Sequence, residues 1–487
     1  MTAAVWLIDG AYDRRIGVSG RSGLGATFAA GWWMGFGYFL AGLWWVGAAF
    51  LVQADKFAWA LPLGVVALPA GLALFWGLGF VLARLLWSGS FVRIFALAFG
   101  LGVLEWGRGV VLTGFPWNDV GMALGGNLTL AQAASLVGLH GLTFVSIAIF
   151  AAPATLWSFA KNRLNPYPLL FSLSLVGLIA VFGWTRLSSP PSPNVPGVKL
   201  RLIQPNVSQG ADFSPENKDA ILSRYIDLSE EDVPGRSPPE TTHFIWPESA
   251  FPFILSRDAA AMTEIAEFLG KGRILITGAA RMEETPGESR RYYNSIEVLD
   301  NSGLTSARYD KQHLVPFGEY IPLQSLLDWT GVTQFVDIPG GFSSGIGRRI
   351  LNIPGLPSAI PLICYEAIFP AEAARDIDGA SSGSWLLNVT DDAWFGLTPG
   401  PYQHYAQARL RAIELGLPLV RDANSGISAV VDGMGRELVK SSLGVETVLD
   451  SDLPEPLPST LERRFGSLAA VFIAFLCFAL SRVKISR

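Results

Sequence analysis

Cysteine and histidine are scarce in this chain, which has 2 cysteines and 4 histidines among 487 residues. A cysteine that is alone in its folded domain has no disulfide partner there, so a disulfide framework is excluded. The histidines are scattered, and their spacing supports neither a zinc site nor a Cys–His pair: they are His140, His243, His313 and His404. A glycine-rich phosphate loop is missing too, and we therefore predict no metal and no cofactor.

Charge is also scarce. Only 16% of the residues are charged, half are hydrophobic and the mean hydropathy is +0.36, whereas a soluble domain carries about 25% charged residues. The deficit is local, because residues 24–185 hold few charges and residues 199–463 have an ordinary composition. The net charge of −5 and the lack of a basic patch argue against a nucleic-acid partner. We expect a membrane part and a soluble part.

Six apolar runs are candidate membrane spans, since a bilayer needs about 20 apolar residues. Glu105 and Arg108 interrupt the third run, and we interpret them as an i,i+3 pair at the outer end of a short helix. Residues 112–117, Leu-Thr-Gly-Phe-Pro-Trp, are expected to form a loop at headgroup level. Five runs precede the soluble part and one follows it: residues 24–52, 57–82, 94–111, 128–160, 167–185 and 465–481.

Lysine and arginine in the short loops predict the orientation of the spans. The short loops on one side of the membrane carry only Lys56 and, within the third run, Arg108, whereas those on the other side carry many more basic residues. Both termini are therefore expected in the cytoplasm of a bacterial inner membrane, with residues 186–464 in the periplasm. The loops assigned to the cytoplasm hold ten basic residues: Arg14, Arg15, Arg21, Arg84, Arg93, Lys161, Arg163, Arg482, Lys484 and Arg487.

Proline-rich segments mark the edges of the soluble part. We divide the chain into a transmembrane part (1–187), a linker (188–198), a soluble domain (199–452), a linker (453–464) and a C-terminal helix with a tail (465–487). In the soluble domain β-rich runs alternate with helical ones, which is typical of an α/β sandwich. The predicted strands are 198–204, 242–246, 273–278, 293–299, 307–313, 360–364, 385–390, 417–421 and 428–432, and the helices 216–228, 259–269, 370–376 and 402–415.

Cys364 is the one cysteine of the soluble domain, and it lies near the end of a predicted strand. It is either an inert buried side chain or a nucleophile. Glu248 and Lys311 also lie near strand ends, and they can act as general base and as oxyanion donor, aided by the N–H of Tyr365. Each residue alone has a structural interpretation, as a turn residue, an ion-pair partner or packing. Their joint occurrence favours catalysis.

These residues stand in motifs that resemble the Glu-Lys-Cys triad of the nitrilase superfamily. The motifs are Trp-Pro-Glu-Ser around Glu248, Tyr-Asp-Lys-Gln-His-Leu-Val-Pro-Phe-Gly-Glu-Tyr around Lys311, and Ile-Cys-Tyr-Glu around Cys364. Residues 388–396 and 409–421 extend the match. A nitrilase domain between membrane spans, together with the Thr-Gly-Phe-Pro-Trp loop, resembles the apolipoprotein N-acyltransferase family.

The resemblance implies a multi-pass α-helical membrane domain and a nitrilase-like αββα sandwich. It implies that Cys364 takes an acyl chain from a phospholipid and passes it to the α-amine of a diacylglyceryl-cysteine lipoprotein. Glu248 is then the base and Lys311 the oxyanion donor, and we expect a monomer. The supporting residues are expected to be Glu319, Tyr365 and Glu366, and the acyl-chain contacts Phe213, Phe317 and Trp394.

The chain departs from the family pattern in three places. The family usually has eight spans, and residues 1–9 resemble the end of its second one, so we expect two spans to be missing. Phe213 stands where the family often has tryptophan, which keeps an aromatic ring but removes an indole donor. Asp391 stands where asparagine is common, so a local hydrogen bond is expected to differ.

Two other functions are compatible with parts of the sequence. A membrane-tethered amidase would use the same triad on a small amide with water as acceptor, and only the membrane spans argue against it. A transporter or scaffold with a decayed outer domain would have a broken triad. The triad of Glu248, Lys311 and Cys364 is intact, which favours an enzyme.

Overall fold

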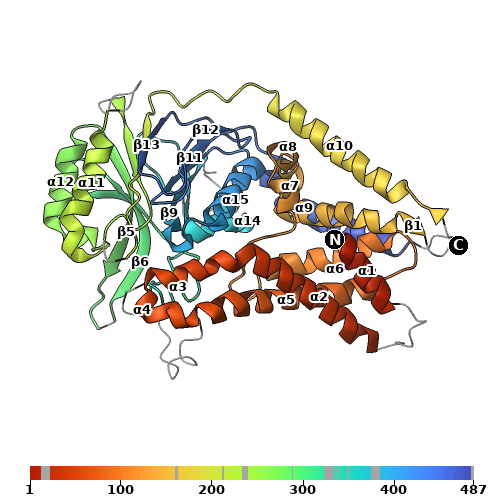
Figure 1. Ribbon diagram of the computed structural model, residues 1–487. Coiled ribbons are helices and arrows are strands. Elements are labelled where there is room, and N and C mark those ends of the chain that lie inside the picture. Colours follow the sequence, from red (N-terminus) through yellow and green to blue (C-terminus); the bar gives the residue numbers. More distant parts are fainter. Residues whose placement is uncertain are drawn as a thin grey trace.

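Figure 1 shows the computed structural model, in which a helical part adjoins a part built on two β-sheets. The structure describes residues 1–12, 22–158, 163–210, 213–232, 240–287, 289–322, 334–336, 338, 340–347, 350–374 and 384–483. Several loop cations of the orientation prediction, such as Arg14 and Lys161, lie outside these residues.

The helical part contains four helices that are long and apolar enough to cross a membrane, at Gly23–Val52, Ala54–Leu85, Ala134–Thr155 and Tyr167–Leu187. Apolar side chains cover their outer surfaces, as expected for contact with lipid. The chain is therefore a membrane protein. The helices of this part are α1 (Thr2–Tyr12), α2 (Ser22–Leu43), α3 (Ala49–Val52), α4 (Ala54–Phe57), α5 (Leu61–Leu85), α6 (Arg93–Arg108), α7 (Met122–Gly125), α8 (Leu128–Ala131), α9 (Ala134–Ala151), α10 (Tyr167–Leu187), α16 (Leu461–Phe465) and α17 (Leu468–Ser481).

Two of the predicted spans are shorter than expected. Residues 94–111 contribute to α6, which has 16 residues, and residues 465–481 contain α17, which has 14. Both are shorter than the roughly 20 residues that a perpendicular span needs. They pack against each other and against α9 inside the helical part, and the rings of Phe99 and Phe478 lie 5.3 Å apart.

The fourth predicted span is broken. Gly138 has a φ of 63°, so α9 is interrupted there, and the Leu139 N–H donates to Glu414 Oε1 at 2.6 Å. Glu462 closes the other side, since a Cβ on Gly138 would lie 2.7 Å from its carboxyl carbon. Both carboxylates come from outside the apolar run, which is why its hydropathy alone could not predict the break.

The soluble part consists of a six-stranded and a five-stranded sheet that face each other. The strand orders are β13-β3-β4-β5-β6-β7 and β12-β11-β10-β9-β8. Val, Ile and Leu side chains from both sheets form the core between them, including Leu202, Ile276, Leu387 and Val420. The strands are β3 (Leu200–Gln204), β4 (His243–Trp246), β5 (Ile274–Glu283), β6 (Arg291–Leu299), β7 (Thr305–Asp310), β8 (Ala359–Ile363), β9 (Trp385–Thr390), β10 (Leu419–Ala423), β11 (Ala429–Val431), β12 (Glu437–Lys440) and β13 (Thr447–Ser451).

Helices cover the outer faces of the sheets and complete an αββα sandwich (Figure 1). Helices α11 (Lys218–Glu230) and α12 (Ala259–Leu269) pack on the six-stranded sheet, and α14 (Pro370–Ala374) and α15 (Pro399–Leu415) on the five-stranded one. This arrangement confirms the predicted fold class.

Three details of the strand prediction are wrong. The strand predicted at 307–313 ends at Asp310, because the main-chain N–H groups of Gln312 and His313 turn away to Glu366. Strands β12 and β13 were not predicted. Strand β12 is largely exposed and therefore lacks a marked apolar pattern, and β13 has only two apolar residues, Val448 and Leu449, beside its pairing with β3.

Candidate active site

The three predicted catalytic residues follow the ends of three strands. Glu248 follows β4, Lys311 follows β7 and Cys364 follows β8. Their side chains are buried, with 6%, 1% and 7% of their surface exposed. Because β4 and β8 belong to different sheets, the residues meet where the two sheets end side by side.

Two carboxylates hold the Lys311 ammonium group. Its Nζ lies 2.9 Å from Glu319 Oε1 and 3.3 Å from Glu248 Oε1. Burial disfavours its charge, but the attraction of Glu319 and Glu248 prevails and raises the pKa of Lys311. Asn294 Nδ2, on β6, donates to both carboxylates at 2.7 and 2.9 Å. The sequence reasoning missed Asn294, because a lone asparagine inside a strand carries no motif.

The Glu248 side chain is fixed from the main chain as well. The Asp391 N–H donates to Glu248 Oε2 at 2.8 Å. The turn that carries Glu248 lies directly against Gly278 of β5, where a Cβ would come within 2.5 Å of the Glu248 Cα. Glycine at 278 therefore lets the strand and the turn approach each other.

Cys364 begins the 3₁₀ helix Cys364–Ile368 with a φ of 48°, a left-handed conformation that is uncommon for a residue with a side chain. Burial and the Glu248 carboxylate raise the pKa of the Cys364 thiol. Lys311 opposes them, but the pKa stays above its ordinary value. Glu248 and Lys311 are thus close enough to influence the thiol. A thiol with a raised pKa is protonated at neutral pH, so its reaction needs a base nearby.

Glu366 ties the cysteine turn to the segment after β7. Its Oε2 accepts from the Ile363 N–H at 2.8 Å, and its Oε1 accepts from Tyr309 Oη at 2.8 Å. The same Oε1 accepts the N–H groups of Gln312 and His313 at 2.9 and 3.1 Å. This fully buried carboxylate therefore sets the position of the Lys311 segment relative to Cys364.

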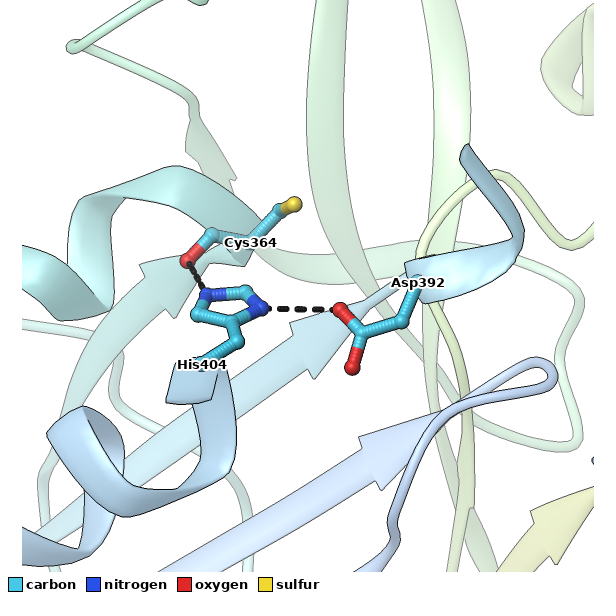
Figure 2. A group of neighbouring side chains, drawn as sticks. All are labelled: Cys364, Asp392 and His404. Atoms are coloured by element: carbon cyan, nitrogen blue, oxygen red, sulfur yellow. Dashed lines mark hydrogen bonds and ion pairs between the residues drawn. The ribbon is translucent and has the colours of Figure 1, made fainter. Parts of the chain in front are cut away.

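A buried polar network lies behind Cys364. His404 of α15 contacts the main-chain oxygen of Cys364 through Nε2 at 3.1 Å and Asp392 Oδ1 through Nδ1 at 2.8 Å (Figure 2). Asp392 also binds Arg421 Nη2 at 2.7 Å. Burial opposes the Asp392 charge, but Arg421 and His404 lower the pKa of that carboxyl to about 2. The sequence reasoning set His404 aside because its spacing from Cys364 matches no motif.

Cys364, Asp392 and His404 also carry three potential metal ligands within 4.8 Å of one another. The set does not fit a metal centre, because both ring nitrogens of His404 already face hydrogen-bond partners. The thiol points away from the ring (Figure 2).

The loop after α6 contacts the catalytic turn. Tyr365 Oη donates to the Gly114 oxygen at 3.1 Å. Trp117 is 2% exposed, and its Nε1 donates to Gln403 of α15 at 2.9 Å. Trp117 therefore packs between Trp45 of the helical part and Phe395 of the soluble part, and the position of this loop at headgroup level stays a prediction. The Glu105–Arg108 pair is confirmed at 2.7 Å, and Arg108 also holds the Trp117 oxygen at 2.8 Å.

The predicted acyl-chain contacts lie in three different surroundings. Phe213 packs against the cluster beneath α11 and α12. Phe317 is 49% exposed, has a φ of 62° and stands between Lys311 and Glu319 in the sequence. Trp394 stacks with Phe335 at 6.5 Å. The role of all three stays a prediction.

The His313 side chain has a structural role, because it packs on Phe369 and contacts Glu372. Its ring stacks on Phe369 with 3.9 Å between centroids, and its Nδ1 lies 2.6 Å from Glu372 Oε1. Because β7 ends at Asp310, His313 and Lys311 do not share the face of a strand.

Residues 16–153 match the apolipoprotein N-acyltransferase N-terminal domain, and residues 210–457 match the carbon-nitrogen hydrolase family. An apolipoprotein N-acyltransferase from Rhodopseudomonas palustris is 49% identical over 479 residues, which cover 97% of this chain and 88% of the relative. The chain belongs to the apolipoprotein N-acyltransferase family. A relative of the same name from Bradyrhizobium diazoefficiens is 48% identical over 489 residues, 99% of this chain and 90% of that protein. The suspected family is thus confirmed.

Proposed function

We propose that the chain transfers an acyl chain from a membrane phospholipid, through a thioester on Cys364, to the N-terminal α-amine of a diacylglyceryl-cysteine lipoprotein. The position of Lys311 is the observation that supports the catalytic roles of Glu248, Lys311 and Cys364. Lys311 is held by Glu319 and Glu248 and acts on the pKa of Cys364. The family name of the relatives supports a lipoprotein acceptor and a lipid donor.

In the first half-reaction Glu248 takes the thiol proton while sulfur attacks the ester carbonyl carbon. Lys311 and the Tyr365 N–H face the oxyanion that forms. The carbon–oxygen bond then breaks, and Glu248 returns the proton to the departing lysophospholipid oxygen. Glu319 holds Lys311, and Asn294 holds Glu248, in this arrangement.

In the second half-reaction the lipoprotein amine attacks the thioester carbon and gives a proton to Glu248. The carbon–sulfur bond breaks, the amide forms, and the Cys364 sulfur takes the proton back. The catalyst is regenerated without oxidant, reductant or metal. The hydrogen bond from Tyr365 to Gly114, in the loop after α6, supports this proposal, because it connects the cysteine turn to the helical part and both proposed substrates carry acyl chains.

The orientation belongs to the same proposal, with the soluble part in the periplasm of a bacterial inner membrane. In Figure 1, β1 (Trp157–Ser158) lies at the end of the helical part that is farthest from the sheets. Arg163, which pairs with Ser158 of β1, therefore adjoins that end, and a basic residue there supports a cytoplasmic face under the positive-inside rule.

Mass spectrometry of Cys364 tests the function. The purified protein is incubated with vesicles of phosphatidylethanolamine and phosphatidylglycerol. We expect Cys364 to gain the mass of one acyl chain and to lose it when a diacylglyceryl peptide is added. Cys364→Ala should abolish both steps, whereas Cys477→Ala, on a buried face of α17, should leave both unchanged. An unmodified Cys364 combined with hydrolysis of a small amide would support the amidase instead.

A further inference from the structure

The peptide group that joins Cys364 to Tyr365 has two polar groups, a carbonyl oxygen and an N–H, and His404 contacts the carbonyl oxygen. Its carbonyl oxygen lies 3.1 Å from His404 Nε2. Its N–H belongs to the second residue of the 3₁₀ helix Cys364–Ile368, and the first N–H groups of a helix have no partner inside that helix. This N–H is the group that the proposed mechanism uses as an oxyanion donor.

A planar trans peptide couples the directions of its two polar groups. The structure has no cis peptide bond among the described residues, so the Tyr365 N–H points opposite to the Cys364 carbonyl. Whatever holds the carbonyl therefore aims the N–H. In Figure 2 the imidazole approaches the carbonyl, while the thiol points away from the ring. His404 thus contacts the peptide group and not the reacting sulfur.

The His404 ring is itself held on the remaining side. Asp392 binds Nδ1 at 2.8 Å, and Arg421 lies 3.2 Å from the same nitrogen. Arg421 is anchored in turn on Asp392 and on Asn388 of β9. All of these side chains are fully or almost fully buried. A network so enclosed fixes the ring, which cannot rotate without breaking several hydrogen bonds.

The turn at Cys364 needs such support. A φ of 48° is unfavourable for a cysteine, and a relaxed turn would rotate the 364–365 peptide. We propose that His404 is a positioning residue of the oxyanion hole: it donates from Nε2 to the Cys364 carbonyl and so aims the Tyr365 N–H at the oxyanion. This inference rests on the proposed thioester mechanism.

Two variants of His404 separate this role from general stability. In His404→Gln the amide nitrogen reaches the position of Nε2 and can still donate to the carbonyl. In His404→Asn the amide is one bond shorter and cannot reach it. His243 supplies the matched control, since it is also buried and its Nε2 lies 2.9 Å from a main-chain oxygen, that of Pro354. His243→Gln and His243→Asn should leave every reaction of Cys364 unchanged.

Two probes of the full-length protein in detergent distinguish the oxyanion hole from the thiol. Hexadecanal adds to Cys364: the C–S bond forms, and the aldehyde oxygen becomes the oxyanion and then takes the thiol proton. Iodoacetamide alkylates the same sulfur with loss of iodide and forms no oxyanion. His404→Asn should bind hexadecanal about tenfold or more weakly, and should form the phospholipid thioester more slowly by a similar factor, since one oxyanion donor is worth about 100-fold to 1,000-fold in rate. Its alkylation should stay near that of the wild type, and His404→Gln should resemble the wild type in all three.

The outcomes decide between this inference and the proposed function. Equal behaviour of the Gln and Asn variants, or a parallel loss of alkylation in His404→Asn, overturns the positioning role. A wild-type protein that binds hexadecanal but forms no thioester with phospholipid overturns the proposed function, while the difference between the His404 variants would still stand.

Discussion

Asp391 is a buried carboxyl whose main-chain N–H holds the Glu248 base. Burial, and then the Glu248 carboxylate, raise its pKa from 3.8 to about 8. The side chain is therefore neutral at neutral pH. A protonated carboxyl is uncharged, as an asparagine side chain is, so either residue would leave this position neutral.

Asp391→Asn should stabilise the protein increasingly as the pH rises. The folded state keeps the Asp391 proton up to about pH 8, whereas the unfolded state releases it near 3.8, so the wild type loses stability across this window. The asparagine variant does not, and since one pKa unit corresponds to about 1.4 kcal/mol, we expect a gain on the order of 4–6 kcal/mol near pH 8 and about 1–2 kcal/mol near pH 5. Thermal unfolding in detergent measures it. Asp219→Asn, at an exposed position, is the control, and a gain independent of pH would refute the assignment.

Glu248→Gln and Lys311→Met should respond differently to pH. The glutamine cannot take a proton, but its neutrality also removes a charge that raises the thiol pKa. Raising the pH then forms thiolate directly and should partly restore acylation. Lys311→Met loses a cation at the oxyanion and should remain about 100-fold to 1,000-fold slow.

Single-turnover acylation of Cys364 between neutral and alkaline pH measures both rates. Equal rescue of the two variants, or rescue of neither, would show that the roles are wrongly assigned. In that case Lys311 would act mainly by lowering the thiol pKa, or Glu319, 2.9 Å from Lys311, would share the role of base.

At the scale of elements, α15 links the membrane helices to the catalytic turn. Gln403 Oε1 accepts from Trp45, in the 3₁₀ helix Trp44–Ala48 that follows α2, and from Trp117, at 3.1 and 2.9 Å. The next residue, His404, contacts the Cys364 carbonyl. One turn of a helix thus touches the membrane part and the nucleophile.

Gln403→Leu should destabilise the junction. Trp45 keeps a second acceptor in the Gly42 oxygen at 2.9 Å, but the Trp117 N–H loses its bond to Gln403 while buried. An unpaired buried donor costs about 1–3 kcal/mol, which should lower the apparent unfolding temperature in detergent. Tyr402→Phe, at the exposed neighbouring residue, should change it little. A Gln403→Leu variant as stable as the wild type would show that the indole finds another partner.

The sequence could predict the strands and helices that have a clear apolar pattern within their own segment. Periodicity and strand-end motifs gave β3 to β11, α11, α12 and α15 approximately, and the positions of Glu248, Lys311 and Cys364. Contacts between side chains that are distant in the sequence could not be predicted. Asn294, the Glu414 contact that accommodates the break at Gly138, and the His404 network depend on side chains that meet only after folding. The roles of the catalytic residues stay predictions until variants are measured.

At the scale of the whole molecule, orientation can be tested by labelling in a Cys364→Ala, Cys477→Ala background. Ser189 is exposed just after α10, and Gly89 is exposed between α5 and α6 with open space around its Cα. If the soluble part faces the periplasm, a membrane-impermeant maleimide added to spheroplasts should label Ser189→Cys and not Gly89→Cys. Lysed cells should label both. The reverse pattern would place the soluble part in the cytoplasm.

The packing of α17 on α6 and α9 has a consequence for biosynthesis. The ribosome makes α17 after every catalytic residue, so the helical part remains incomplete while the sandwich is being synthesised. Glu462, which lies against Gly138 of α9, is made late as well. A chain that stopped prematurely at residue 458 would contain the whole triad and still lack the helix that closes its bundle. Quality control in the membrane could therefore recognise an unfinished copy by its open bundle, regardless of whether its active site had formed.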